Sequence, residues 1–226
     1  MVATLEQIRA RLADATETIS TMEVLDRVGD PLQAVVRRSL EAANAGPVLR
    51  GDWLGHPLHP LLTDLPIGFW TSAWVLDFGG RRTSRAADTM VAAGLLAVGP
   101  TALAGLADWA ERDRPDRRLG LAHLAANVTA TWLYAASLAN RRRGHRVRGI
   151  ALSWVGATAA TVGGYLGGHL AFAAGDTSAA EPSAFEEAGI VDPQGAMMSE
   201  MSQTGELGGD VVEGLTSPAT LGAPRG

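Results

Sequence analysis

Four apolar segments of about 20 residues each follow one another through the middle of this chain of 226 residues. They cover residues 61–78, 89–109, 119–139 and 149–174. An α-helix needs about 20 apolar residues to cross the hydrocarbon core of a bilayer. The pattern therefore predicts an all-α fold: an integral membrane four-helix bundle in residues 53–174, with the lipid bilayer as its direct partner.

The flanking segments differ from this domain in composition. Apolar residues recur at three- and four-residue steps over residues 4–28, so residues 1–52 are predicted to be an amphipathic helical segment on the bilayer or on the domain. A second short helix is expected from Asp30 to Leu40. Residues 175–226 are rich in Gly, Ser, Pro and acidic residues, and we expect them to form a disordered tail.

Charge predicts an orientation, because four crossings place both ends of the chain on one side of the membrane. The loops on the other side, residues 80–85 and 140–148, contain eight Arg, and the loop at 111–118 contains four. The positive-inside rule then places the two Arg-rich loops in the cytoplasm. Three more arginines, at positions 37, 38 and 50, lie on the side of the termini and reduce the difference in arginine number between the two sides. No exposed basic face is evident, so no nucleic-acid partner is expected.

The chain has no cysteine, which excludes a disulfide, an iron–sulfur cluster or a thiolate zinc site held by this chain. It also lacks the Gly-x-Ser-x-Gly, P-loop and His-Glu-x-x-His motifs. The sequence leaves open whether the chain is an enzyme, and it favours a protein that is not an enzyme on its own.

A polar segment rich in proline, from Gly55 to Gly68, leads into the first apolar segment. Its prolines, Pro57, Pro60 and Pro66, are expected to exclude a long regular helix, because proline lacks the backbone N–H. Ionisable side chains at a membrane boundary are costly to bury and often mark a functional site. We therefore look for function in this segment first.

Counting along the four segments places most of the histidines at one depth, on the side of the termini. Two carboxylates, Asp64 and Asp108, fall at the same depth. A single site at the end of a four-helix bundle would bring such side chains together. The candidate ligands are His56, His59, His123 and His169.

Polar residues also recur at every fourth position of the last two apolar segments. In lipid such a stripe is expected to face the interior of the bundle. Small residues at positions 160, 163, 164, 167 and 168 would let a neighbouring backbone or a flat ligand approach the fourth segment. The two stripes are His123, Asn127 and Thr131, and Thr161, Tyr165 and His169.

Paired histidines in a four-helix bundle suit haem b, because neutral imidazole is a common axial ligand and needs no cysteine. We predict this cofactor, with its ligands drawn from the four histidines named above. An alternative is a divalent metal ion bound by His56, His59, Asp64 and Asp108. Proton transfer is a third, because histidine titrates near neutral pH. The same side chains could also serve only to cap and pack the helices.

Several motifs of the chain resemble one family. They are Gly-His-Pro-Leu-His-Pro-Leu-Leu-Thr-Asp-Leu-Pro-Ile-Gly at 55–68, the segments 101–109 and 163–170, and His123. They are similar to a family of uncharacterised bacterial four-span membrane proteins, classed as a domain of unknown function, over about residues 20–174. In many relatives a Rieske-type iron–sulfur domain follows, and others accompany cytochrome c modules. The resemblance therefore implies a bacterial plasma membrane and a redox setting.

The chain departs from the fused arrangement, because residues after 174 contain neither the Cys nor the His that a Rieske cluster requires. Any Rieske or cytochrome-type electron partner must then be a separate protein. We predict a haem-binding or redox-partner module in membrane electron transfer. The main alternative is a non-catalytic membrane anchor or scaffold, and metal or proton handling at one face comes third. The small-residue faces also allow a homo-oligomer.

Overall fold

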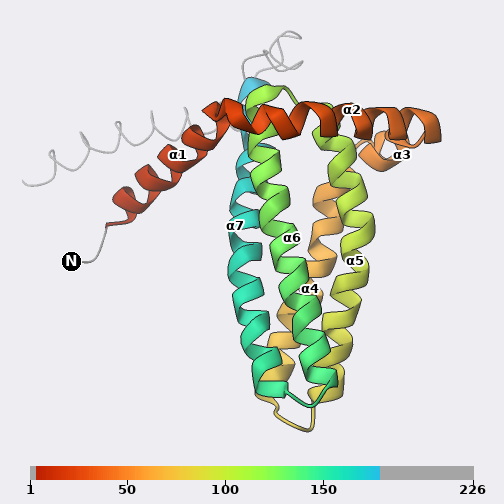
Figure 1. The fold of residues 1–226 in the computed structure, drawn as a ribbon, viewed down its shortest axis with the longest axis vertical. Coiled ribbons are helices and arrows are strands. Elements are labelled where there is room, and N and C mark those ends of the chain that lie inside the picture. Colours follow the sequence, from red (N-terminus) through yellow and green to blue (C-terminus); the bar gives the residue numbers. More distant parts are fainter. Residues whose placement is uncertain (1–3, 179–226) are drawn as a thin grey trace, which may run out of the picture. The chain divides into compact units, whose positions relative to one another are not determined.

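The computed structural model describes residues 4–178, with side chains to residue 171, and this part of the chain is helical with short connections and no strand. The chain divides into two units, residues 1–172 and 173–226, and all the described side chains belong to the first. Its four long helices run alternately up and down beside one another (Figure 1). They are α4, Leu58–Phe78; α5, Ser84–Ala110; α6, Arg114–Arg142; and α7, Arg146–Ser178.

Each predicted apolar segment lies inside one of these helices. Two of the helices, α5 and residues 146–171 of α7, are long and apolar enough to cross a membrane. The segments predicted as loops at 80–85 and 140–148 are partly helical, because α5 begins at Ser84 and only residues 143–145 separate α6 from α7. The predicted disordered tail lies outside the described residues, except that residues 175–178 belong to α7.

The expectation that proline excludes a long regular helix is wrong. The helix α4 is continuous through Pro60 and Pro66. Pro60 lies in the first turn, where a missing N–H costs little. Pro66 removes the donor that the carbonyl of Leu62 would use, and the hydroxyl of Thr101 in α5 lies 3.1 Å from that oxygen. The same hydroxyl lies 2.8 Å from the carbonyl oxygen of Ala97 in its own helix, so its one proton is shared and replaces the hydrogen bond removed by the proline only in part.

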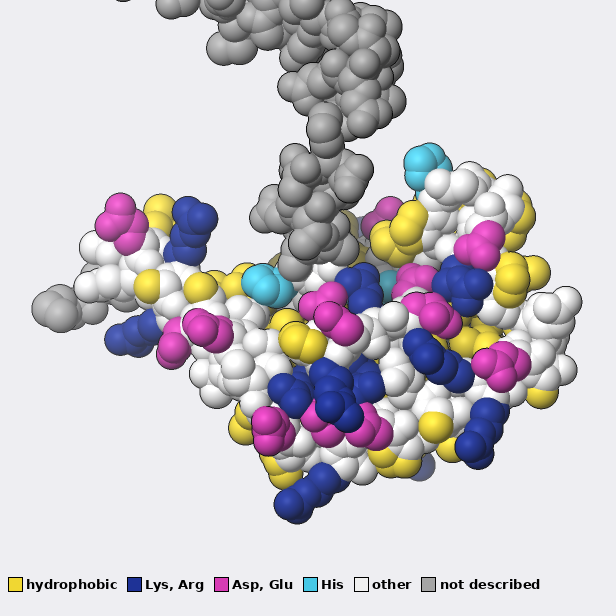
Figure 2. Space-filling model, turned by 90° about the horizontal axis from the view of Figure 1, so that it is seen from above, with side chains coloured by type: hydrophobic (Ala, Val, Ile, Leu, Met, Phe, Trp, Pro, Cys, Tyr) yellow, Lys and Arg dark blue, Asp and Glu magenta, His cyan; other side chains and the backbone are white. Residues whose placement is uncertain are grey.

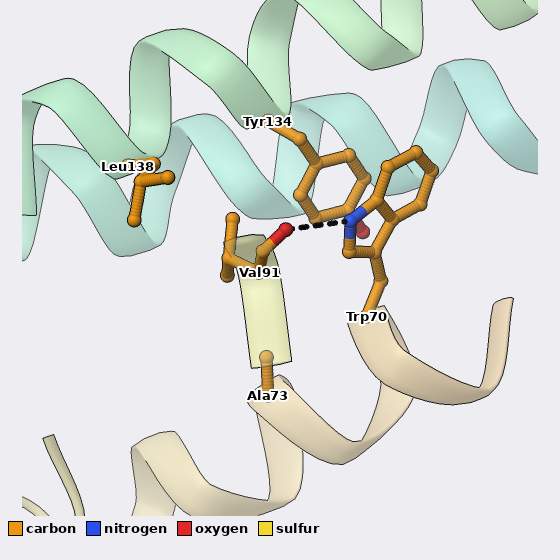
Figure 3. Packing of buried hydrophobic residues seen from close by; sticks show 5 residues of the cluster. All are labelled: Trp70, Ala73, Val91, Tyr134 and Leu138. Carbon is orange, nitrogen blue, oxygen red and sulfur yellow. Dashed lines mark hydrogen bonds between the residues drawn. The ribbon is translucent and has the colours of Figure 1, made fainter. Parts of the chain in front are cut away.

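Aromatic side chains form the core between the long helices (Figure 3). Trp70 of α4 stacks on Tyr134 of α6, with ring centroids 3.9 Å apart and planes 12° apart. The indole N–H of Trp70 donates to the carbonyl oxygen of Val91 in α5 at 3.4 Å. One turn along α4, Trp74 stacks on Trp154 of α7 with a centroid distance of 5.1 Å. These contacts join all four long helices.

The N-terminal segment forms three helices where two are predicted: α1, Leu5–Thr21; α2, Asp26–Ala43; and α3, Gly46–Arg50. Turns of 3₁₀ helix follow α1 at Glu23–Leu25 and α3 at Asp52–Leu54. The helix predicted over residues 4–28 therefore ends early, and the next one begins before Asp30. A 3₁₀ turn keeps nearly helical spacing of side chains, so the apolar pattern does not reveal the break.

The helix α2 lies across the connection between α5 and α6, and we call this end of the long helices the α2 end. The amide of Gln33 donates to the carbonyl oxygens of Ala110 and Arg112 at 2.8 and 3.0 Å. Arg37 Nε donates to the same Ala110 oxygen at 2.7 Å. Carbonyls at a helix C-terminus have no partner in their own helix. The α2 side chains thus cap α5.

Two arginines at the start of α6 bind α2 by ion pairs. The guanidinium of Arg118 contacts both carboxylate oxygens of Asp26, at 2.9 and 2.5 Å. Arg117 is only 6% exposed; it contacts Asp30 and donates to Gln33 Oε1 at 2.6 Å. Figure 2 looks onto the α2 end and shows basic and acidic side chains intermixed across it.

The pair of Asp26 and Arg118 predicts a loss of stability in acid. Hydrogen bonds from Arg118 lower the pKa of Asp26 below its ordinary value. The ionised Asp26 contributes fully to the stability of the fold above that ordinary pKa, about 3.9. This contribution is lost as the pH falls through the lower pKa of the folded state. In detergent, the wild-type protein should therefore unfold at a higher temperature than Asp26→Asn at about pH 6. This difference in thermal midpoint should shrink as the pH is lowered to about 2. A constant difference between the two proteins over this range would contradict the prediction.

Candidate functional site

His59 lies in the first turn of α4, at the α2 end. Its Nδ1 lies 2.9 Å from the carbonyl oxygen of Thr101 in α5. A carbonyl oxygen only accepts hydrogen bonds, so Nδ1 carries the proton and Nε2 of the neutral ring keeps its lone pair. The hydroxyl of the same Thr101 reaches Leu62. One position in α5 therefore holds both the proline-containing helix and the imidazole.

His123 lies in α6 and is held in the same way by α7. Its Nδ1 lies 2.8 Å from the carbonyl oxygen of Gly163. The amide of Asn127, one turn further along α6, lies 3.2 Å from His123 Nε2 and donates to the His123 carbonyl at 2.9 Å. The prediction that this polar stripe faces the interior is confirmed for His123 and Asn127.

The two imidazole rings meet between the helices, with centroids 6.1 Å apart and planes at 83°. Glycines make this possible. A Cβ on Gly105 of α5 would lie 2.7 Å from the ring of His59, and one on Gly167 of α7 would lie 2.8 Å from the ring of His123. Thus α4 and α6 supply the rings, while α5 and α7 supply a carbonyl and a glycine surface for each ring.

The other two candidate ligands do not join this pair. His56 is exposed before the start of α4, and His169 is exposed on α7. Among the described residues, neither makes a hydrogen bond or ring contact with His59 or His123. The structure therefore brings together two of the four histidines that depth along the helices groups into one site.

The expectation that the polar stripe of the fourth segment faces the interior is wrong. Thr161 and His169 are exposed, and Tyr165 is 40% exposed. A Cβ at Gly163 would lie 2.7 Å from the Asn127 amide, and Gly167 is similarly close to His123. The inner face of α7 must be glycine at these positions, so its larger polar side chains lie on the outer face.

The alternative metal-binding set, His56, His59, Asp64 and Asp108, is not assembled. Asp64 is exposed on α4, while Asp108 is half-buried in α5 and interacts electrostatically with His59. In the part of the chain that the structure describes, no three His, Asp or Glu side chains are grouped so that they could hold a metal ion.

Sequence reasoning missed a second polar centre, at the opposite end of the long helices, which we call the Arg141 cluster. The Arg141 side chain is fully buried and donates to both carboxylate oxygens of Asp77, at 2.8 and 2.6 Å. Its Nε donates to Ser137 Oγ at 3.0 Å, and Nη2, which also binds Asp77, lies 3.1 Å from Ser153 Oγ. Arg146 of α7 also contacts Asp77, at 2.7 Å.

All four long helices contribute to this cluster, because Asp88 of α5 lies 3.5 Å from Arg141. A signal was present in the sequence. Asp77 and Asp88 lie where α4 ends and α5 begins, at the same predicted depth as the Arg-rich segment 140–148. The positive-inside argument counts Arg141 and Arg146 as loop charges, whereas the structure pairs them with these carboxylates.

Comparison with known proteins gives one family. The model of a family described as predicted membrane protein (DUF2231) matches residues 55–179, more than half of the chain. The matched range includes both histidines of the pair and the whole Arg141 cluster, and it leaves α1 to α3 outside. No curated protein and no solved structure matches the chain. The sequence resemblance is thereby confirmed from residue 55 onward and not over residues 20–54, and the chain belongs to the DUF2231 family of predicted membrane proteins.

Proposed function

We propose that this chain crosses the membrane four times, through α4 to α7, and binds haem b between His59 and His123 as a one-electron carrier in membrane electron transfer. The observation that carries the proposal is the imidazole pair, in which each Nδ1 is bound to a backbone carbonyl of a neighbouring helix. Histidine ligands of metals are typically held by such a bond to their second nitrogen.

The exposed surface of the long helices supports four crossings. Large apolar side chains are exposed on every one of them, as expected for contact with lipid and not with water. The charged clusters lie near the two ends, and the 27 residues of α5 span about 40 Å, enough for a hydrocarbon core and its headgroups. Among these exposed side chains are Leu61, Val75, Phe78, Leu96, Trp132 and Val155.

We base the proposed orientation in a bacterial plasma membrane on a small excess of exposed arginines at one end of the long helices. Six lie exposed at the end of the Arg141 cluster, whereas Arg117 and Arg118 at the α2 end are paired with α2. Four are exposed at the α2 end: Arg27, Arg37, Arg38 and Arg114. The positive-inside rule then places the Arg141 end in the cytoplasm. The six are Arg81, Arg82, Arg85, Arg142, Arg143 and Arg148.

The spacing of the two rings is compatible with a shared iron. Two imidazoles on one metal can have centroids about 6 Å apart, because each metal–nitrogen bond measures about 2 Å, and the centroids here are 6.1 Å apart. An edge-to-face contact of two rings without a metal has the same spacing. Bound haem would supply a Fe(III)/Fe(II) couple. His59 and His123 would ligate it, Thr101 and Gly163 would fix the two rings, and the Asn127 amide would give up its contact with His123 Nε2. The electron partner would be a separate Rieske or cytochrome-type protein.

The rival function, a membrane scaffold, has an observation in its favour. The same Nδ1 contacts join α4 to α5 and α6 to α7, so the histidines could act only as links between helices. The two functions differ in whether the Nε2 atoms take a ligand, which absorption spectra can decide.

We expect the protein purified in detergent after haem supplementation to show a Soret band, with sharper visible bands after reduction by dithionite. His59→Ala and His123→Ala should each lose this spectrum, because each removes one of the two histidines that would hold the haem. His56→Ala and His169→Ala are matched controls and should keep it, since the structure places both away from the pair. Helix content from circular dichroism would show that every variant remains folded.

Two outcomes would contradict the haem proposal. Colourless protein that contains stoichiometric metal would make the imidazole pair a metal-ion site. Colourless, metal-free protein would favour the scaffold. If all four histidine variants lost the spectrum equally, this would support the site of four histidines that the sequence predicts. It would contradict a site formed by His59 and His123 alone.

A further inference from the structure

A hollow of about 200 Å³ opens at the α2 end, between α2, α3 and the end of α5. Charged side chains of both signs line it: Arg37 and Glu41 from α2, Arg50 from α3, and Glu111 next to α5. It is separate from the imidazole pair and from the Arg141 cluster, and neither the fold nor the proposed electron carrier requires it.

The two arginines of this hollow form only long ion pairs, although Arg37 Nε is fixed on the Ala110 carbonyl oxygen and Arg50 Nη2 also lies 3.3 Å from Asp52. Arg37 Nη2 lies 3.4 Å and Arg50 Nη1 lies 3.8 Å from Glu111, which is itself 54% exposed. Charge-assisted hydrogen bonds are normally about 2.7–2.9 Å long, and Arg118 and Asp26 at the same end lie within this range or closer. Two guanidinium groups therefore converge on a weakly held anion that another anion could replace.

The carboxylates of the hollow are equally available. Glu41 is exposed and forms no ion pair within the part of the chain that the structure describes. Glu111 would be released if a stronger anion took its place beside the arginines. The lining of the hollow thus offers two cationic and two anionic groups. Such a site suits a ligand that carries one charge of each sign.

The surroundings place this hollow at the membrane surface. Next to Arg50, the 3₁₀ turn Asp52–Leu54 exposes Trp53 by 68% and Leu54 by 40%, and Val48 of α3 is 59% exposed. Tryptophan is enriched at the headgroup level of bilayers. The hollow therefore faces lipid headgroups, if the four crossings of the proposed function hold.

We infer that this hollow binds the headgroup of a phospholipid that carries both a phosphate and a primary ammonium, as phosphatidylethanolamine does. Arg37 and Arg50 bind the phosphate, because guanidinium groups match phosphate oxygens in geometry and charge. Glu41 and Glu111 accept hydrogen bonds from the ammonium. A quaternary ammonium has no N–H to donate, and a glycerol headgroup has no cation, so both should bind less well. The inference rests on the proposed membrane topology and not on haem.

The test is native mass spectrometry of the full chain after incubation with equal amounts of phosphatidylethanolamine, phosphatidylcholine and phosphatidylglycerol in detergent. We expect several-fold more phosphatidylethanolamine than either other lipid to be retained. Arg50→Gln should abolish the preference, and Glu41→Gln should reduce the ratio of ethanolamine to choline lipid. Arg38→Gln is the matched control, because Arg38 is exposed on α2 outside the hollow, and it should leave the preference unchanged.

Three results would overturn the inference. Equal retention of the three lipids would remove the site, and a preference for phosphatidylglycerol would make it an ordinary anion site. Displacement of the lipid by inorganic phosphate, with the same dependence on Arg50, would make free phosphate the ligand. Flotation with liposomes tests the membrane topology separately. If the chain does not float, both the topology and this inference fail; if it floats without lipid preference, only this inference fails.

Discussion

Replacing Arg141 by Met should destabilise the protein more than any other single change at the ends of the long helices. Removing one partner of a buried ion pair typically costs about 3–5 kcal/mol, because the remaining charge stays buried without compensation. Asp77 would keep Arg146 as a neighbour at 2.7 Å, so we expect the lower end of that range, about 3 kcal/mol. Unfolding in mixed micelles with increasing dodecyl sulfate would measure the effect.

The neighbouring Arg142 provides the control for this experiment. It lies in the same last turn of α6, is exposed, and makes no ion pair with any described residue. Arg142→Met should therefore change the unfolding midpoint very little. The double variant Asp77→Asn with Arg141→Met should recover part of the loss, because it removes the unpaired carboxylate. Equal midpoints for Arg141→Met and Arg142→Met would show that the buried pair does not stabilise the fold.

The second large effect is expected in the aromatic core, where Gly94 of α5 lies against Trp70. A Cβ at position 94 would lie 2.3 Å from Trp70 Nε1. The indole cannot move away easily, because it is 7% exposed and stacked on Tyr134. Gly94→Ala should therefore cost about 1–3 kcal/mol, as other overpacked cores do, although alanine favours helix more than glycine does.

Gly68 of α4, two residues before Trp70, gives the opposite expectation. An ideal Cβ there has no atom within 4 Å. Gly68→Ala should then be neutral or stabilising by up to about 1 kcal/mol, the difference in helix propensity between the two residues. Thermal unfolding followed by circular dichroism would compare the pair. If both substitutions shift the midpoint in the same direction, the close packing of Gly94 against Trp70 is not a stability determinant.

The four long helices could be predicted because length and apolar composition are local properties of the sequence. The continuity of α4 could not be predicted in this way. The hydroxyl of Thr101, 39 residues from Leu62 along the chain, offers the Leu62 carbonyl part of the hydrogen bond that Pro66 removes. A proline is disruptive by default, and only the tertiary structure shows that its effect is offset. The 3₁₀ turn after α1 could not be predicted for a different reason: the apolar residues keep nearly the same spacing through the turn as in an α-helix.

The sequence could predict how deep each candidate side chain lies along its helix, but not on which side of the helix it lies. Depth along the helices placed His59 and His123 at one level, and the structure puts their rings in contact. It gave no information on rotation about the helix axis, so His169 was grouped with them although it lies on the outer face of α7. The signal for rotation was in the glycines. Gly163 and Gly167 face side chains of α6, while an ideal Cβ at Gly164 or Gly168 has no atom within 4 Å.

The position of α2 also limits the order in which this chain can be completed. Its side chains bind carbonyls and arginines at the junction of α5 and α6, and the partners are separated by 73 to 92 residues along the chain. A ribosome makes α2 first and these partners much later. The helix therefore has no docking site until the hairpin of α5 and α6 exists. Although α2 is synthesised before all four long helices, it must be among the last helices to reach its place.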